Sequence, residues 1–255
     1  MTPALAAYVG LVLTRVGAFV AVMPLFSGRT PKTVRAALAV AIVAFYLGQV
    51  APAWDRHIAG QAGDIHWLSY SIAMLREALL GAAMGFAFGL FFLPARVAGE
   101  FLTQQIGLAL SPQNGLTGDQ PAGPLTLAFE AAAALVFFHL DGHHIAFAAL
   151  HASFAKLPLG GTLLPDGVVP ALDGLSSAYE MGLLLAGPLS LCLFLLAVVL
   201  AIMARAAPQL NIYSVGFTLQ VGVALAGALW LMPDTIALLA GYVGRAGDTV
   251  GRFLG

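Results

Sequence analysis

The chain has 255 residues, of which 60% are hydrophobic and only 9% are charged, with a formal net charge of -1. Soluble domains usually carry about 25% charged residues, so this composition indicates an integral membrane protein. The near-zero net charge excludes the basic surface expected of a nucleic-acid-binding protein, and a single cysteine excludes an internal disulfide framework.

Long apolar segments follow one another along the chain, at about 4–26, 36–53, 68–93, 125–150, 180–203 and 212–232. Each approaches or exceeds the roughly 20 residues that a helix needs to cross the hydrocarbon of a bilayer. A shorter apolar piece, 234–243, follows Pro233, which we expect to break the preceding helix. None of these segments has the alternating pattern of a membrane strand. We therefore predict a single all-α membrane domain over 1–255, with a surface loop over 158–174.

Ionic residues occur inside these apolar segments, namely Arg15, Arg76, Glu77 and Glu130. An arginine at the centre of a membrane helix costs about 2.5–3.5 kcal/mol on insertion scales, so Arg15 should face protein or water. Adjacent residues do not share a helix face, so we expect Arg76 and Glu77 to pair with other helices rather than with each other. Interhelical ion pairs are the favoured interpretation, because a proton or ion relay usually needs several carboxylates in sequence.

A glycine repeat lies in the third apolar segment, where Gly81, Gly85 and Gly89 recur every four residues in GAAMGFAFG. This spacing places the glycines along one helix face and allows another helix to approach closely. The repeat predicts tight helix packing and carries no chemistry of its own.

Histidines cluster in the stretch FFHLDGHHIAFAALH (137–151), which holds His139, Asp141, His143, His144 and His151. A metal site is one interpretation, since imidazole and carboxylate both bind divalent ions. However, Asp141 and Gly142 form a turn signal that spoils the helical spacing of His139 and His143, and no HExxH motif is present. We favour a polar turn in which Asp141 caps the following helix, and we expect no metal, cofactor or catalytic residue.

The longest uncharged polar stretch is TQQIGLALSPQNGLTGDQPAGP (103–124), which is rich in glycine and proline. Irregular backbone cannot face lipid, so it must be solvated, buried in protein or lining a cavity. From composition alone, a mobile element inside a pore and a plain surface loop are equally compatible with this stretch.

A second polar stretch, ARAAPQLNIYSVGFTLQ (204–220), separates the last two long apolar segments. Pro208 prevents the preceding helix from continuing smoothly, and the amides of Gln209 and Asn211 are costly to bury without hydrogen-bond partners. We expect a sharp turn that locks two helices and contacts a neighbouring subunit. Arg205 would hydrogen-bond the carbonyls at the end of its helix.

These residues closely resemble the FliR/SctT family, the inner-membrane export-gate proteins of bacterial type III secretion. The resemblance covers nearly the whole chain and rests on several stretches in the family's order. They are RVGAFVAVMPLFSGRTPKTVRAALA (15–39), REALLGAAMGF (76–86), GEFLTQQIGL (99–108), DGHH (141–144), LPLG (157–160) and ARAAPQLNIYSVGFTLQ (204–220). The stretches DGHH and NIYSVGF are nearer to the flagellar branch than to the injectisome branch.

The resemblance implies a subunit of a helical, cone-shaped export gate in the bacterial inner membrane, within the flagellar basal body. Family members resemble a FliP-like unit fused to a FliQ-like unit. The implied partners are FliP-like and FliQ-like gate subunits, FlhB-like and FlhA-like export components, unfolded export substrates and membrane lipid. The gate conducts passively, so the resemblance implies no enzyme activity. Neighbouring subunits would provide ionic partners for Arg15, Arg76, Glu77 and Glu130.

The family also carries a loop that plugs the gate from within, and residues 106–122 match it by position and composition. The residues that this match nominates for the plug are Gly107, Ser111, Pro112, Gln113, Asn114, Gly115 and Asp119. Glycines supply hinge freedom, and a segment with almost no charge is not held by strong ion pairs, as a movable plug requires.

Three alternatives remain open at the level of the sequence. The first is an injectisome SctT homologue. The second is a secondary transporter that works alone, which would need inverted repeats and a binding site at the membrane midplane; neither is visible. The third is an intramembrane metalloenzyme that uses His139, Asp141, His143 and His144.

Overall fold

The computed structural model describes residues 3–24, 30–58, 67–107, 123–157, 159, 168–206 and 212–254. Within these ranges every regular element is a helix, which confirms the predicted all-α class. The helices are α1 (Pro3–Val22), α2 (Lys32–Ile58), α3 (Trp67–Gly89), α4 (Leu93–Gln105), α5 (Pro124–His139), α6 (Gly142–Lys156), α7 (Val168–Ala206) and α8 (Ile212–Leu254).

Two helix boundaries interrupt segments that the sequence predicted to be continuous. The segment 68–93 ends as α3 at Gly89, and a turn leads into α4, which has a proline in its first turn. The segment 125–150 is divided at Leu140 and Asp141 into α5 and α6. Asp141 has a φ of 54°, a left-handed conformation that aspartate tolerates better than most residues. The turn that we expected at Asp141 and Gly142 therefore interrupts the helix, although the residues on both sides are apolar.

The last two helices are longer than predicted. α7 has 39 residues and continues through Pro188, while α8 has 43 residues and continues through Pro233, so the predicted break at Pro233 is wrong. A proline removes only one helical hydrogen bond, and packing can carry the helix past it with a bend. α7 also begins at Val168, inside the surface loop predicted for 158–174. At 1.5 Å per residue, both helices are about twice as long as a bilayer's hydrocarbon is thick.

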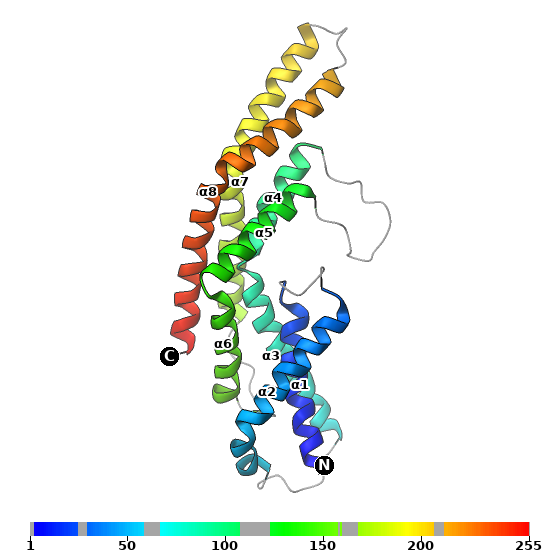
Figure 1. The fold of residues 1–255 in the computed structure, drawn as a ribbon, viewed down its shortest axis with the longest axis vertical. Helices are drawn as coiled ribbons and strands as arrows, with labels where there is room; N and C mark the ends of the chain where they lie inside the picture. Colours follow the sequence, from blue (N-terminus) through cyan, green and yellow to red (C-terminus); the bar gives the residue numbers. More distant parts are fainter. Residues whose placement is uncertain are drawn as a thin grey trace. The chain divides into compact units, whose positions relative to one another are not determined.

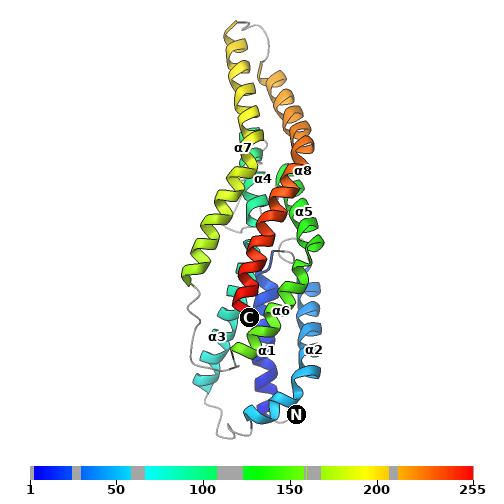
Figure 2. The ribbon, with the colours of Figure 1, turned by 90° about the vertical axis from the view of Figure 1, so that its left-hand side faces the viewer.

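The chain divides into two compact units, and each combines distant parts of the sequence. Unit 1 comprises Met1–Gly89 and His144–Ala171, and unit 2 comprises Leu90–His143 and Leu172–Phe253. In unit 1, α1 packs against both α3 and α2 (Figure 1). In unit 2, α4 packs against α5, and α7 and α8 form a long antiparallel pair (Figure 2).

The core of unit 1 is formed largely by one face of α1. Val16, Phe19 and Val20 are almost completely buried, and the ring of Phe19 meets that of Phe88 edge-on at 6.1 Å. Aromatic pairs favour this arrangement, because the positive edge of one ring faces the negative face of the other. The apolar side of α1 is thereby fixed against α3.

The core of unit 2 lies between α4 and α5 and extends to the α7–α8 pair. Ala95, Ala98 and Leu102 of α4 are completely buried. Small residues along a helix allow a neighbouring backbone to approach closely. Along the α7–α8 pair, a Cβ at Gly227 would lie 2.5 Å from Leu189, and one at Gly216 would lie 3.2 Å from Leu200. These contacts share one antiparallel register.

Among the described residues, fewer helices than expected have the length and composition of a membrane span. In the described part of the chain three qualify, within α3, α7 and α8, and a fourth is added if α5 and α6 count as one broken span. The described apolar part of α1 is only Ala6–Val22, and the sequence of α2 ends with charged residues in WDRHI. The sequence therefore has more apolar runs than the described residues have helices long and apolar enough to cross a bilayer.

Candidate functional site

A buried ionic network joins α1, α3 and α6 in unit 1. Arg15 Nε donates to Glu77 Oε2 at 2.5 Å, and both side chains are fully shielded from solvent. Arg15 Nη1 donates to the Ser153 carbonyl at 2.9 Å, and Nη2 donates to the Leu157 carbonyl at 3.0 Å. The guanidinium also lies over the ring of Phe154, 4.7 Å from its centroid. The planar guanidinium of Arg15 thus binds the Glu77 carboxylate of α3 and two backbone carbonyls at the C-terminal end of α6.

Glu77 has a second cation nearby, since Arg76 Nη1 lies 3.5 Å from Glu77 Oε1. Glu77 therefore pairs across helices with Arg15, as expected, but it also contacts Arg76, its neighbour in sequence. The expectation that other subunits supply the partners of Arg15 and Glu77 is corrected, because these partners lie within the chain. Two buried charges must be compensated, and a pair inside the chain meets this need before any assembly.

Glu130 differs from the other ionic residues inside the apolar segments, because its side chain is half-buried on α5. On the neighbouring α4, Arg96 Nε donates to Glu100 Oε1 at 2.8 Å, and both side chains are largely exposed. This hydrogen bond raises the pKa of Arg96, to which Glu130 adds a smaller Coulombic contribution. Arg96 is therefore a permanent cation beside two carboxylates.

The glycine repeat of α3 faces α1. A Cβ at Gly81 would strike the backbone carbonyl of Arg15, and one at Gly85 would lie 2.7 Å from the carbonyl of Phe19. At Gly89 the nearest atoms belong to Pro24, at 3.2 Å. Gly81 and Gly85 are needed for the close approach of the two helices, and that approach brings Glu77 within reach of Arg15.

The predicted plug segment, 106–122, lies mostly outside the described residues. Of its candidate residues, the structure describes only Gly107; Ser111, Pro112, Gln113, Asn114, Gly115 and Asp119 fall in the part that it does not describe. Gly107 is exposed, has a φ of 71°, and donates its N–H to the Gln104 carbonyl at 3.0 Å. This left-handed conformation ends α4 and favours glycine.

The two helices that flank the predicted plug segment are tightly joined. A Cβ at Gly99 would collide with the backbone of Thr126, and one at Gly123 would collide with the side chain of Thr103. The hydroxyls of Thr103 and Thr126 lie 3.4 Å apart. Because α4 and α5 are antiparallel at this contact, both ends of the segment begin from one firmly packed hairpin.

Gln105, the last residue of α4, is a residue that the sequence did not single out. Its side chain is half-buried, and Nε2 donates to the carbonyl of Ser190 in α7 at 2.8 Å. The adjacent Gln104 is exposed. Two neighbouring glutamines carry no signal that distinguishes them until the packing of α4 against α7 is known.

The turn motif between α7 and α8 is also only partly described. Arg205 is exposed in the last turn of α7, whereas Pro208, Gln209 and Asn211 lie outside the described residues. An arginine in this position interacts favourably with the negative end of the helix dipole.

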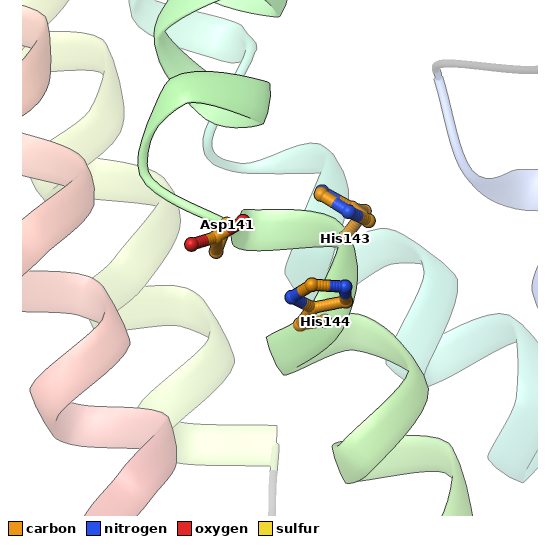
Figure 3. Close-up of side chains that lie close together, drawn as sticks. All are labelled: Asp141, His143 and His144. Carbon is orange, nitrogen blue, oxygen red and sulfur yellow. The ribbon is translucent and has the colours of Figure 1, made fainter.

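The histidine stretch brings three potential metal ligands together at the junction of α5 and α6 (Figure 3). Candidate ligand atoms of Asp141, His143 and His144 lie within 4.8 Å of one another, and His139 is not in this group. Two ligands at about 2.1 Å from one Zn²⁺ ion can be no more than about 4.2 Å apart. The three residues are close because they are nearly consecutive in the chain. This arrangement alone does not define a metal site.

A small cavity of about 10 Å³ in unit 1 is lined by Tyr8, Val12, Tyr46, Leu47 and Phe154. Its walls are mainly apolar, and it has room for about one water molecule. The cavity is therefore too small for an organic substrate.

Comparisons with known proteins agree with this architecture. The model of the family "Bacterial export proteins, family 1" matches residues 6–246. The flagellar biosynthetic protein FliR of Escherichia coli (strain K12) is 33% identical over 228 residues, which cover 85% of this chain and 82% of that protein. FliR of Bacillus subtilis (strain 168) is 26% identical over 225 residues, covering 84% and 81%.

A more distant similarity extends to another relative. The surface presentation of antigens protein SpaR of Shigella sonnei is 27% identical over 151 residues, which cover 58% of this chain and 57% of that protein. The flagellar relatives named above cover more of the chain than SpaR does. With a family model that matches almost the whole sequence and an all-helical fold, the chain belongs to family 1 of the bacterial export proteins.

Proposed function

We propose that this chain is a subunit of the type III protein export gate in the bacterial inner membrane and that it serves flagellar biosynthesis. The observation that carries this proposal is the family match over residues 6–246. The FliR relatives support the flagellar branch, because the Escherichia coli protein aligns with 85% of the chain. In this role the subunit would form part of a gated channel for unfolded export substrates and would catalyse no reaction.

The exposed apolar surface supports an assembled state in a membrane. Trp230 and Leu229 of α8 are 84% and 73% exposed, and Leu184 and Ile202 of α7 are 68% and 65% exposed. Large apolar patches mark protein–protein or membrane contacts, since monomeric soluble proteins rarely expose them. We assign this surface to FliP-like and FliQ-like gate subunits and to lipid, and we expect FlhB-like and FlhA-like components next to the gate.

Residues 106–122 are proposed as the plug of this channel. The firm α4–α5 hairpin supports this role, because a plug needs fixed ends and a movable middle. Gly107 permits the sharp departure from α4, with its φ of 71°. The residues assigned to the plug are Gly107, Ser111, Pro112, Gln113, Asn114, Gly115 and Asp119.

The stretch 204–220 is proposed as an assembly turn. Arg205 is exposed at the end of α7 and therefore accessible to a neighbouring subunit. Pro208 would terminate the helix, and the amides of Gln209 and Asn211 would form hydrogen bonds within the turn and across the subunit contact.

Deletion of the gene in the source bacterium tests the proposed function. We expect loss of flagellar filaments and of motility, both restored by a tagged copy that co-purifies with FliP-like and FliQ-like proteins. Intact flagella together with loss of effector secretion would instead support the injectisome alternative. Transport by the purified chain alone in liposomes, without any partner, would contradict the gate and support a secondary transporter.

A further inference from the structure

The middle of α7 lacks one helical hydrogen bond and can therefore bend. Pro188 has no N–H group, so the helical hydrogen bond to the carbonyl of Leu184 cannot form. Two residues later, Ser190 Oγ donates to the Gly187 carbonyl at 2.9 Å. Such a bond from a serine to its own helix often bends the helix. Figure 2 shows that α7 changes direction along its length.

Helix α4 lies against α7 on both sides of Pro188. A Cβ at Gly182 would lie 2.7 Å from the Cβ of Val97 and 2.9 Å from the carbonyl of Pro94. Eight residues further along α7, the Ser190 carbonyl accepts the hydrogen bond from Gln105 Nε2, at 2.8 Å. The two helices therefore run in the same direction, and the end of α4 reaches α7 just after Pro188.

The Gln105 amide makes this contact although its other polar atom is buried without a hydrogen bond to any described residue. Its Oε1 is buried and accepts no hydrogen bond from any residue that the structure describes. A buried, unsatisfied acceptor is unfavourable, and a leucine of similar size would avoid it. The donor group of Gln105 is therefore the feature that distinguishes this residue from an apolar one at the same place.

We propose that Gln105 is a positioning residue that braces the bend in α7 and sets the angle of the arm beyond it. The arm consists of residues 191–206 of α7 with the part of α8 packed on them. Gly216 contacts Leu200 in the same antiparallel register in which Gly227 contacts Leu189. α8 therefore stays alongside α7 beyond Pro188 and belongs to the arm. Pro188 makes the bend possible, and the Gln105 amide selects one angle by holding the carbonyl that follows it.

This inference goes beyond the proposed function, because it concerns the geometry of unit 2 alone. The arm carries exposed apolar side chains, including Phe194 and Ile202, at 58% and 65% exposure. If the arm docks on other gate subunits, as the proposed function requires, its angle determines whether these side chains meet their partners. That consequence rests on the proposed function, whereas the brace itself does not.

A distance measurement on the full chain tests the brace. Spin labels are placed at Glu100→Cys on α4 and at Ile202→Cys on α7, both exposed positions, in a Cys192→Ser background. The 14 residues from Pro188 to Ile202 correspond to about 21 Å of helix, so a change of about 20° in the bend would move the second label by about 7 Å. We expect Gln105→Leu to shift or broaden the distance distribution.

Gln104→Leu is the matched control, because Gln104 is the exposed neighbour on the same turn. It should leave the distance distribution unchanged. An unchanged distribution in Gln105→Leu would overturn the brace. An equal change in both variants would also overturn it, because the effect would then be a general loosening of α4.

Gln105→Glu provides a second variant that leaves the size of the side chain unchanged. At pH 9 its carboxylate is ionised and cannot donate to the Ser190 carbonyl, whereas the protonated form at pH 4 can; the range is wide because partial burial raises the pKa of a carboxyl group. We expect an altered distance at pH 9 that returns to the parent value at pH 4, while the parent distance does not vary with pH. A distance in Gln105→Glu that is the same at both pH values would contradict the brace. No export activity is needed, so failure here would leave the gate proposal intact.

Discussion

Arg15 determines how three helices of unit 1 meet. Its guanidinium binds Glu77 of α3, the Ser153 carbonyl of α6 and the Leu157 carbonyl just beyond it. The last carbonyls of a helix lack partners within the helix and carry partial negative charge. A buried cation therefore satisfies both a carboxylate and the C-terminal end of α6. Lysine could not replace it, because only arginine offers a planar fork of donors.

Arg15→Met should destabilise the folded chain strongly. The substitution removes the guanidinium that pairs with the buried Glu77 carboxylate, and it removes the arginine donors to the Ser153 and Leu157 carbonyls. Breaking one side of a buried ion pair typically costs about 3–5 kcal/mol. We expect a marked drop in the amount of folded protein and in its thermal stability in detergent, measured by fluorescence-detected size-exclusion chromatography after heating.

The double variant Arg15→Met with Glu77→Leu is the control for this prediction. It removes the uncompensated charge, so it should recover part of the stability lost in Arg15→Met. If the double variant is less stable than Arg15→Met, the loss comes from packing and not from the buried charge.

At the scale of elements, the α1–α3 contact depends on the absence of side chains on α3. Gly81 and Gly85 lie directly against backbone carbonyls of α1. Helix backbones that approach this closely gain dispersion contacts over a long stretch. The same approach sets the position of Glu77, so a packing motif without chemistry determines the geometry of the ion pair.

Gly81→Ala should separate the two helices. The new methyl group would collide with the Arg15 carbonyl, which is backbone and cannot move aside cheaply. Overpacking of this kind costs about 1–3 kcal/mol. Gly17→Ala on α1 is the matched control, because no atom lies within 4 Å of its added Cβ. We expect a lower thermal unfolding midpoint for Gly81→Ala alone; equal midpoints for the two variants would show that the contact is not tight.

At the scale of the whole molecule, the two units interleave along the chain. Each is assembled from an early and a late stretch of sequence, so neither can be cut out as one continuous piece. The proposed plug segment, 106–122, belongs by sequence to unit 2, between helices that pack on each other. Removing its middle should therefore leave the packing of both units in place.

Deletion of residues 110–118 should make the assembled gate leak ions without preventing its assembly. The flanking α4–α5 contact through Gly99 and Thr126 remains, so the yield of the complex should stay near that of the wild type. Ion leak through the membrane should rise, measured as dye or potassium flux in cells that contain the complete export machinery. Normal yield with an unchanged leak would contradict the plug assignment, and a lost complex would show that the segment has a structural role.

The sequence by itself determined the all-α membrane class, the family and the turn at Asp141. Composition, apolar runs and turn residues express these features within a few neighbouring positions. It also predicted correctly that Glu77 pairs with another helix, but it could not name that partner. Arg15 lies 62 residues from Glu77 and 138 residues from Ser153, and no spacing rule connects such distant positions.

Only the tertiary structure decided which polar groups meet and which prolines interrupt a helix. α8 continues through Pro233, against the local signal, because packing can compensate for one lost hydrogen bond. Gln105 differs from Gln104 only through the position of α7, whose Ser190 carbonyl it binds. Local sequence encodes where helices form, whereas contacts between distant helices depend on the free energy of packing and charge burial in the complete fold.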